Sequence, residues 1–294
     1  MQSLPTISTK PENWKAERFA VQQAGNGHKK ARAGKGFQPM EERFTPQMTV
    51  DHFTSLRGIA IEDIGIAPVV VISWGRNVIP SLANMTDAQP SPYWFYGERQ
   101  PFFTGSVQGK QVSFVQAPVG ASGTVMMMEE MIACGAKTFL GVGWAGSLQP
   151  TSPLGTYIIP TNCIREEGTS FHYLDENVNV GPDQWLVELL HQCAKEENAK
   201  IACGPLWTTD APYREFYNKV ESYSRQGVTG VDMETSAMYA LGQFRGVRVC
   251  NLLVVSDELW QDWRPAFGSQ ELRESTHRAQ RIILKVLKNE WLYQ

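Results

Sequence analysis

The chain of 294 residues has few cysteines and no long apolar run. Its five cysteines are scattered, odd in number and form no Cys-x-x-Cys pair, which argues against disulfides or structural zinc. Its five histidines show no ligand spacing, so we expect no bound metal. No apolar stretch approaches the roughly 18 residues of a membrane-spanning helix, and the start lacks the regions of a secretory signal. We therefore expect a reduced, cytoplasmic protein without a membrane partner.

Charged residues are distributed unevenly along the chain. Residues 1–50 hold eight Lys or Arg against four Glu, while the whole chain has a net charge of −3. The segment 28–36 is basic and polar, which can favour nucleic acid or phosphate but is more typical of a solvated tail. We predict a polar, partly basic extension over residues 1–60 that is poorly ordered in part, followed by one catalytic domain over residues 61–294. Nucleic acid is not the expected partner.

Short apolar runs alternate with helical patterns from about residue 61 onward. The runs at 69–72, 112–116, 137–142 and 157–159 have the length of buried strands. Residues 124–134 suit a helix that Gly135 ends in a left-handed conformation. Apolar residues recur at helical spacing again over 185–193 and 282–287. Alternating strands and helices predict an α/β layered sheet.

The segment Gly141-Val142-Gly143-Trp144-Ala145-Gly146 matches the dinucleotide fingerprint G-x-G-x-x-G. That fingerprint requires a helix whose first turn meets the pyrophosphate. Pro150 and Pro153 follow these glycines and oppose such a helix. We therefore expect no nicotinamide or flavin cofactor.

Two carboxylates stand at the ends of predicted strands. Glu234 follows Gly230-Val231-Asp232-Met233, and Asp257 ends the apolar run 252–256. The helical pattern between them suggests a βαβ crossover, whose parallel strands would bring both carboxylates to one carboxyl edge of the sheet. Small molecules bind at that edge in open α/β sheets. A solvated first-turn carboxylate at Glu234 and a helix cap at Asp257 fit the same pattern.

Four ordered segments carry a family resemblance: 165–173 (Arg-Glu-Glu-Gly-Thr-Ser-Phe-His-Tyr), 208–213 (Thr-Thr-Asp-Ala-Pro-Tyr), 230–238 (Gly-Val-Asp-Met-Glu-Thr-Ser-Ala-Met) and 254–257 (Val-Val-Ser-Asp). Together they resemble the superfamily of hexameric purine nucleoside phosphorylases, uridine phosphorylases and related nucleosidases. The resemblance spans most of residues 68–291. It implies a three-layer α/β/α fold with a central mixed β-sheet, nucleoside phosphorylase-like, and cleavage of the bond between a base and C1′ of ribose.

The resemblance also implies roles for individual residues. Glu234 would grip the ribose hydroxyls and stabilise positive charge on the sugar, and Asp257 would carry a proton to the leaving base. Arg273 would position Asp257. The predicted substrate-binding residues are Met233, Asp232, Ser256, Gly143, Trp144, Gly168, Thr169, Phe171, Asp210 and Tyr213.

Phosphate binding departs from the family pattern. Arg76 and Arg99 match two of the three family arginines, so we predict that they bind phosphate. The third arginine falls at Gly141, and a phosphate-contacting hydroxyl falls at Trp144. Each charge-assisted bond to phosphate contributes about 1.5–3 kcal/mol, so these losses would weaken the site.

Three interpretations remain open. A nucleoside phosphorylase with inorganic phosphate as co-substrate and no cofactor is favoured by the two arginines. A nucleosidase that uses water would explain Trp144 and Gly141, and a non-catalytic nucleoside-binding relative would explain the irregular phosphate site. A purine is favoured over a pyrimidine because of Asp257, although Pro212 stands where the family usually has an aromatic. The resemblance also implies a homo-oligomer, either a dimer or a hexamer built as a trimer of dimers, with Arg99 completing a neighbour's site.

Overall fold

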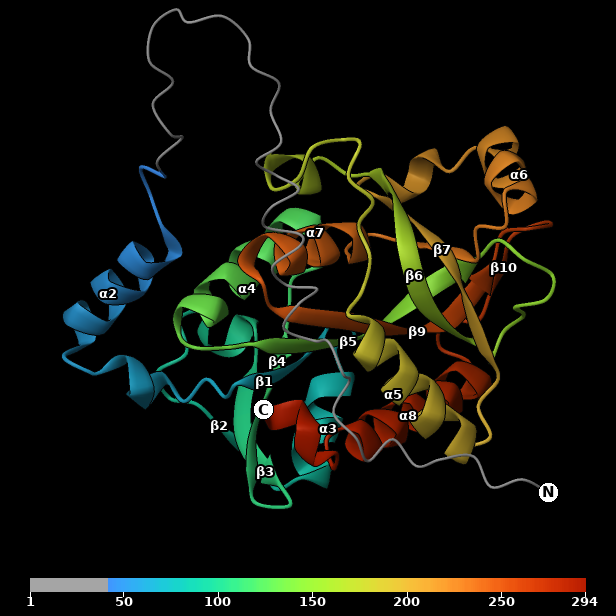
Figure 1. Ribbon diagram of the computed structural model, residues 1–294. Coiled ribbons are helices and arrows are strands. Elements are labelled where there is room, and N and C mark those ends of the chain that lie inside the picture. Colours follow the sequence, from blue (N-terminus) through green and yellow to red (C-terminus); the bar gives the residue numbers. More distant parts are fainter. Residues whose placement is uncertain (1–41) are drawn as a thin grey trace, which may run out of the picture.

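The computed structural model describes residues 42–294. Its helices and strands alternate along the chain as the sequence pattern predicts (Figure 1). The α-helices are α2 (Pro46–Arg57), α3 (Val78–Met85), α4 (Ala121–Ala133), α5 (Gln184–Glu196), α6 (Tyr217–Arg225), α7 (Thr235–Arg245) and α8 (Gln270–Val286). The 3-10 helices are η1 (Ile61–Ile64), η2 (Gly97–Arg99), η3 (Ser170–His172), η4 (Pro212–Arg214) and η5 (Glu290–Tyr293).

Ten strands form one mixed sheet in the order β10-β9-β6-β7-β8-β5-β1-β4-β3-β2. Strand β5 also pairs with β9, so β5, β9, β6, β7 and β8 close into a ring of strands at one end of the sheet. The strands are β1 (Val69–Ser73), β2 (Gln89–Pro90), β3 (Phe102–Val107), β4 (Lys110–Gln116), β5 (Thr138–Ser147), β6 (Tyr157–Glu166), β7 (Ile201–Thr209), β8 (Gly230–Asp232), β9 (Arg248–Glu258) and β10 (Arg264–Pro265).

Helices cover both faces of this sheet, which confirms the predicted three-layer α/β/α fold. One core packs α3, α5 and α8 against one face, and a second core packs α4 and α7 against the other (Figure 1). Successive residues of β1 alternate between the two cores: Val69 and Val71 belong to the first, Val70 and Ile72 to the second. All five residues of β1 are buried, as expected for a parallel strand covered on both faces.

Local sequence signals account for several helix ends. Ser269 begins α8 by accepting a hydrogen bond from the Leu272 amide. After α4, Gly135 has φ of +105°, the left-handed conformation predicted from the sequence. No helix among residues 42–294 is long and apolar enough to cross a bilayer.

Helix α2 lies before the boundary predicted at residue 60. It contacts α4, and its Val50 is buried in the core beneath α4 and α7. Residues 1–41 lie outside the described part of the chain, so the division into an extension and a catalytic domain stays a prediction.

The prediction that β8, α7 and β9 form a parallel βαβ crossover is wrong. Strand β8 runs antiparallel to β5, whereas β9 runs parallel to β5, and the two strands lie on different sides of it. The direction of β8 follows from its parallel pairing with β7, the strand before it in the chain. A three-residue strand carries too little local pattern to reveal such a partner.

Candidate active site

Glu234 is a buried carboxylate between β8 and α7. Glu234 is only 5% exposed, and the Gly120 amide donates a hydrogen bond to its Oε1 over 2.7 Å. Gly120 precedes α4 with φ of +103°, a conformation that favours glycine. The contact therefore ties Glu234 to the turn that follows β4.

Asp232 is a second buried carboxylate, two residues before Glu234. Thr208 donates to its Oδ1 over 2.8 Å, and Thr235 donates to Oδ2 through both its amide and its hydroxyl. Burial, followed by the negative charge of Asp232, raises the pKa of Glu234 to about 8. Both oxygens of Asp232 accept hydrogen bonds from protein donors, and Met233, between Asp232 and Glu234, is half-buried. That Asp232 and Met233 bind substrate stays a prediction.

Asp257 lies near the end of β9 and receives two hydrogen bonds. Ser256 Oγ is 2.7 Å from its Oδ1, and the Trp263 indole Nε1 donates to its Oδ2 over 2.9 Å. Arg273, predicted to position Asp257, lies on the exposed side of α8 and donates to the Gly268 carbonyl. The donor that the structure places on Asp257 is therefore an indole from the loop before β10.

Both carboxylates lie on the carboxyl side of four mutually parallel strands, β4, β1, β5 and β9. Glu234 bonds to Gly120, which follows β4, and Asp257 pairs with Gly146 near the end of β5. The two carboxylates therefore lie at the carboxyl edge expected from the sequence, although the strands that place them there are arranged differently. That the two side chains face one nucleoside stays a prediction.

Packing explains the glycines of β5. A Cβ at Gly141 would lie 2.1 Å from Asn251 Oδ1, and one at Gly143 would lie 2.8 Å from the Trp74 ring. At Gly146 the obstacle is Leu259, 2.6 Å away. Because β5 continues as a strand to Ser147, no helix starts within these glycines, as the two prolines predicted.

Trp144 points toward α8. Its Nε1 donates to Thr276 Oγ1 over 3.2 Å, and its ring centroid is 6.0 Å from that of Phe267. The side chain is 41% exposed. At the position where the family resemblance implies a phosphate-binding hydroxyl, this chain therefore has the partly exposed ring of Trp144.

Two loops of the predicted base site are joined by a hydrogen bond. The Gly168 amide donates to Asp210 Oδ2 over 2.9 Å, which links the segment after β6 to that after β7. The amide of Thr169 donates to Glu167, a buried carboxylate that also accepts from Ser236 at the start of α7. Through Glu167, these loops are connected to the helix that follows Glu234.

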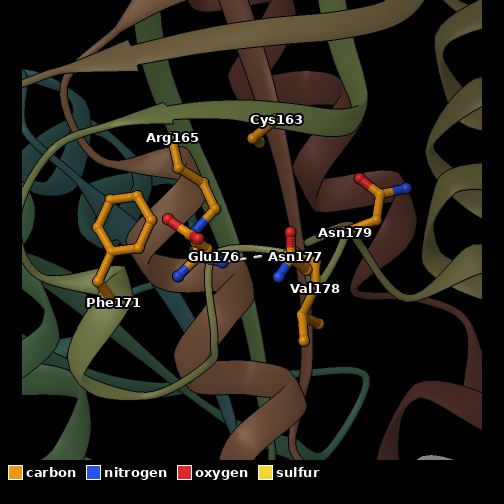
Figure 2. A pocket seen from close by; sticks show the side chains of 7 residues that line it. All are labelled: Cys163, Arg165, Phe171, Glu176, Asn177, Val178 and Asn179. Atoms are coloured by element: carbon orange, nitrogen blue, oxygen red, sulfur yellow. Dashed lines mark hydrogen bonds between the residues drawn. The ribbon is translucent and has the colours of Figure 1, made fainter.

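The aromatic residues predicted near the base lie at the surface. Tyr213 is 98% exposed, and Phe171 lies beneath the Arg165 guanidinium, 4.2 Å from its ring centroid. This pair lines a pocket of about 340 Å³, whose lining side chains are drawn in Figure 2. It is lined by Cys163, Arg165, Phe171, Glu176, Asn177, Val178 and Asn179, and so contains neither Glu234 nor Asp257.

The two arginines predicted for phosphate stand near the same sheet edge. Arg76 follows β1, and Arg99 ends η2 just before β3, whose first residue Phe102 pairs with Val115 near the end of β4. Both are exposed, and neither forms an ion pair with a carboxylate of the described residues.

Trp263, Glu167 and Glu215 were missed by the sequence analysis. Glu215 is half-buried after η4, and burial together with the charge of Asp257 raises its pKa to about 7. Glu167 lies inside the segment 165–173 that carries the resemblance, so its position was a usable signal. Trp263 lies only six residues after Asp257, but it meets that carboxylate through the pairing of β10 with β9, which no local pattern marks. Glu215 is influenced by Asp257 from a strand much later in the chain.

The candidate residues Glu234, Asp257, Arg76 and Arg99 thus stand at the carboxyl edge of the parallel strands of a mixed α/β sheet. Residues 75–288 match the model of the phosphorylase superfamily, and the chain belongs to that family, which confirms the resemblance read from its motifs. A guanosine phosphorylase of Halorubrum lacusprofundi is 23% identical over 234 residues, covering 78% of this chain and 96% of the relative. A uridine phosphorylase of Treponema pallidum is 28% identical over 198 residues, covering 63% and 76%.

A solved structure supports the fold. The crystal structure of purine nucleoside phosphorylase from Toxoplasma gondii superimposes with a TM-score of 0.71 at 24% identity, covering 86% of this chain and 98% of the other. At that identity the likeness concerns the fold alone.

Proposed function

We propose that this protein is a nucleoside phosphorylase that cleaves the N-glycosidic bond of a nucleoside with inorganic phosphate and releases the free base and ribose 1-phosphate. Membership of the phosphorylase superfamily supports this reaction, as do relatives that are guanosine and uridine phosphorylases. No cofactor is needed, because phosphate is a co-substrate.

The observation that carries the proposal is the burial of the Glu234 carboxylate without a cationic partner in the described residues. Its carboxylate is buried and forms no ion pair with a cation of residues 42–294. The transition state of glycosidic cleavage places positive charge on the ribose, and a fixed carboxylate in a site shielded from water stabilises such charge strongly. Glu234 is therefore the group that we assign to the ribose, with Met233 beside it.

Asp257 serves the other side of the reaction. The departing base accumulates negative charge, and an acid or hydrogen-bond donor near its ring nitrogen lowers the barrier. Ser256 and Trp263 hold the Asp257 carboxyl in one orientation through its two oxygens. We favour a purine, whose imidazole nitrogen accepts a proton readily.

Arg76 and Arg99 supply the charge for phosphate. Exposed guanidinium groups without a carboxylate partner in the described residues are available for an anion. We further propose a cytoplasmic homo-oligomer active in purine salvage, with Arg99 reaching the site of a neighbouring subunit.

Base release measured with and without phosphate tests the reaction. We expect release from inosine only with phosphate present, with one ribose 1-phosphate formed for each base. Replacing Arg76 by Ala is expected to raise KM for phosphate roughly 10- to 100-fold, because a charge-assisted bond contributes about 1.5–3 kcal/mol. Arg225→Ala, which removes an exposed helix ion pair with Glu221, is the matched control. Equal release without phosphate would instead indicate a hydrolase.

Replacing Trp263 by Phe separates the two candidates for positioning Asp257. The variant keeps an aromatic ring but removes the Nε1 donor, so we expect kcat to fall about tenfold, the size of one lost charge-assisted hydrogen bond. Arg273→Ala, which removes only a bond to the Gly268 carbonyl, is expected to change kcat less than twofold, a difference worth about 0.4 kcal/mol. The reverse ranking in steady-state kinetics would restore Arg273 to the role predicted from the sequence.

A further inference from the structure

Glu167 is a buried side chain that accepts three hydrogen bonds. It follows β6 directly and is 2% exposed. Its Oε2 accepts from the amides of Thr169 and Ser170 over 2.6 and 2.9 Å, and its Oε1 accepts from Ser236 Oγ over 2.8 Å. One carboxyl group therefore joins the loop after β6 to the first turn of α7.

The loop that Glu167 holds carries residues predicted to bind the base. The Gly168 amide donates to Asp210 Oδ2 over 2.9 Å, so two of these predicted residues already contact each other. Arg165 holds the far end of the same loop, because its guanidinium donates to the main-chain carbonyls of residues 174 and 175. The loop is therefore held at both ends, which gives its predicted base-binding residues a fixed position.

Ser236, the partner of Glu167 on α7, lies two residues after the carboxylate that we assign to the ribose, Glu234. The Ser236 amide donates to Thr208 Oγ1 over 3.1 Å, and Thr208 donates to Asp232 Oδ1 over 2.8 Å. The start of α7 is thus held against β7 and β8. Because Glu167 connects the loop to this fixed turn, the length of its side chain sets how far the loop lies from Glu234.

We propose that Glu167 is a positioning residue, which places the loop 168–170 so that one nucleoside can contact both this loop and Glu234. It acts through the span between its contacts rather than through its charge, because its two oxygens accept from donors on two separate segments. A displacement of about 1 Å at a reacting group can cost on the order of 100-fold in rate, so the placement of this loop matters to the reaction. The inference rests on the proposed function and adds to it a residue that acts through others.

Two conservative substitutions separate span from charge. In Glu167→Gln the amide oxygen accepts from both loop amides and the amino group donates to Ser236 Oγ, so we expect KM for inosine to stay within about threefold of the wild type. Glu167→Asp keeps the charge but is one methylene shorter and does not span from the loop to Ser236. Its KM for inosine should rise at least about tenfold, the cost of ordering roughly one freed residue on binding. KM for phosphate should change less than about twofold in both, because Arg76 and Arg99 belong to other segments.

Ser236→Ala tests the same connection from the helix side. It leaves the two loop amides on Glu167 but removes the link to α7, so KM for inosine should rise about three- to tenfold, the usual effect of one lost hydrogen bond. Glu167→Ala combined with Ser236→Ala should lie within about twofold of Glu167→Ala alone, because both changes remove the same link. Additive losses would mean that the two residues act separately and would overturn the proposal. Glu221→Ala, which removes an exposed carboxylate of α6, is the control and should leave both KM values unchanged.

The steady-state constants also distinguish positioning from a merely structural role. A loss of folded protein lowers kcat and leaves both KM values as they are, and that outcome would overturn the proposal. A greater defect in Glu167→Gln than in Glu167→Asp would overturn it too, since charge would then be what is required. Urea unfolding identifies the variants that are folded, and the comparison of Glu167→Gln with Glu167→Asp decides the question if Glu167→Ala is not. Wild-type protein without phosphate-dependent turnover would overturn the proposed function itself, and the same ranking measured as Kd for inosine would then decide the role of Glu167.

Discussion

Replacing Glu234 by Gln is expected to lower kcat for phosphorolysis by about 100- to 1,000-fold, the usual effect of removing one electrostatic contact to a transition state. Gln keeps the size of the side chain and an oxygen that accepts from the Gly120 amide, so the fold around α4 should persist. What is lost is the negative charge opposite the sugar, which Glu234 acquires when positive charge developing on the ribose lowers the pKa that burial has raised. The measurement is kcat for inosine at saturating phosphate.

The same variant should change how stability depends on pH. The folded-state pKa of Glu234, about 8, lies above its unfolded value, so the wild type favours the protonated carboxyl. That contribution to stability is complete below the unfolded pKa and is lost as pH rises through about 8. Each pKa unit corresponds to about 1.4 kcal/mol. In urea unfolding at pH 5 and pH 9, Glu234→Gln should therefore lose less stability than the wild type.

Glu196→Gln is the control for both measurements. Glu196 is an exposed carboxylate that pairs with Lys285, so its removal should alter neither kcat nor the slope of stability with pH beyond about 0.5 kcal/mol. A Glu234→Gln protein with wild-type kcat would contradict the assignment of this carboxylate to the ribose. An unchanged pH slope would show that Glu234 is ionised in the folded protein at neutral pH.

Residues whose pattern is local could be predicted from the sequence. The apolar run of β1, the helix that Gly135 ends and the amphipathic face of α8 each depend on neighbours within a few positions. Glu234 and Asp257 were also found this way, because each stands at or just after the end of an apolar strand. The alternation of such segments predicts an α/β layered sheet, whereas the three-layer arrangement was predicted from the family resemblance.

Features set by the pairing of strands were out of reach. The direction of β8 depends on β7, and the donor on Asp257 comes from Trp263, which faces it only because β10 folds back antiparallel to β9. The glycines of β5 matched a phosphate-binding motif by letter, although packing against Asn251, Trp74 and Leu259 accounts for them. A sequence motif identifies small residues but does not tell what occupies the space beside them.

Gly141→Ala is expected to destabilise the protein by about 3 kcal/mol, at the upper end of the cost of overpacking a core. The new Cβ would lie 2.1 Å from Asn251 Oδ1. Asn251 is completely buried, and its Nδ2 donates to Thr235 over 2.8 Å, so the amide has little freedom to move away. Equilibrium urea unfolding measures the loss. Gly168→Ala, whose Cβ would meet only Asp210 at 3.8 Å, should stay within about 0.5 kcal/mol of the wild type.

A double-mutant cycle with Asn251→Ala identifies the cause. Asn251→Ala is itself expected to destabilise, because Thr235 loses a hydrogen bond next to Asp232. If the amide is the obstacle, the double variant should be more stable than the sum of the two single effects by more than about 1 kcal/mol. Additive losses would mean that the strand itself, rather than Asn251, rejects a side chain at position 141. Positive coupling would also explain why no arginine stands there, since a longer side chain at Gly141 must displace the amide that holds Thr235 and, through it, the support of Glu234.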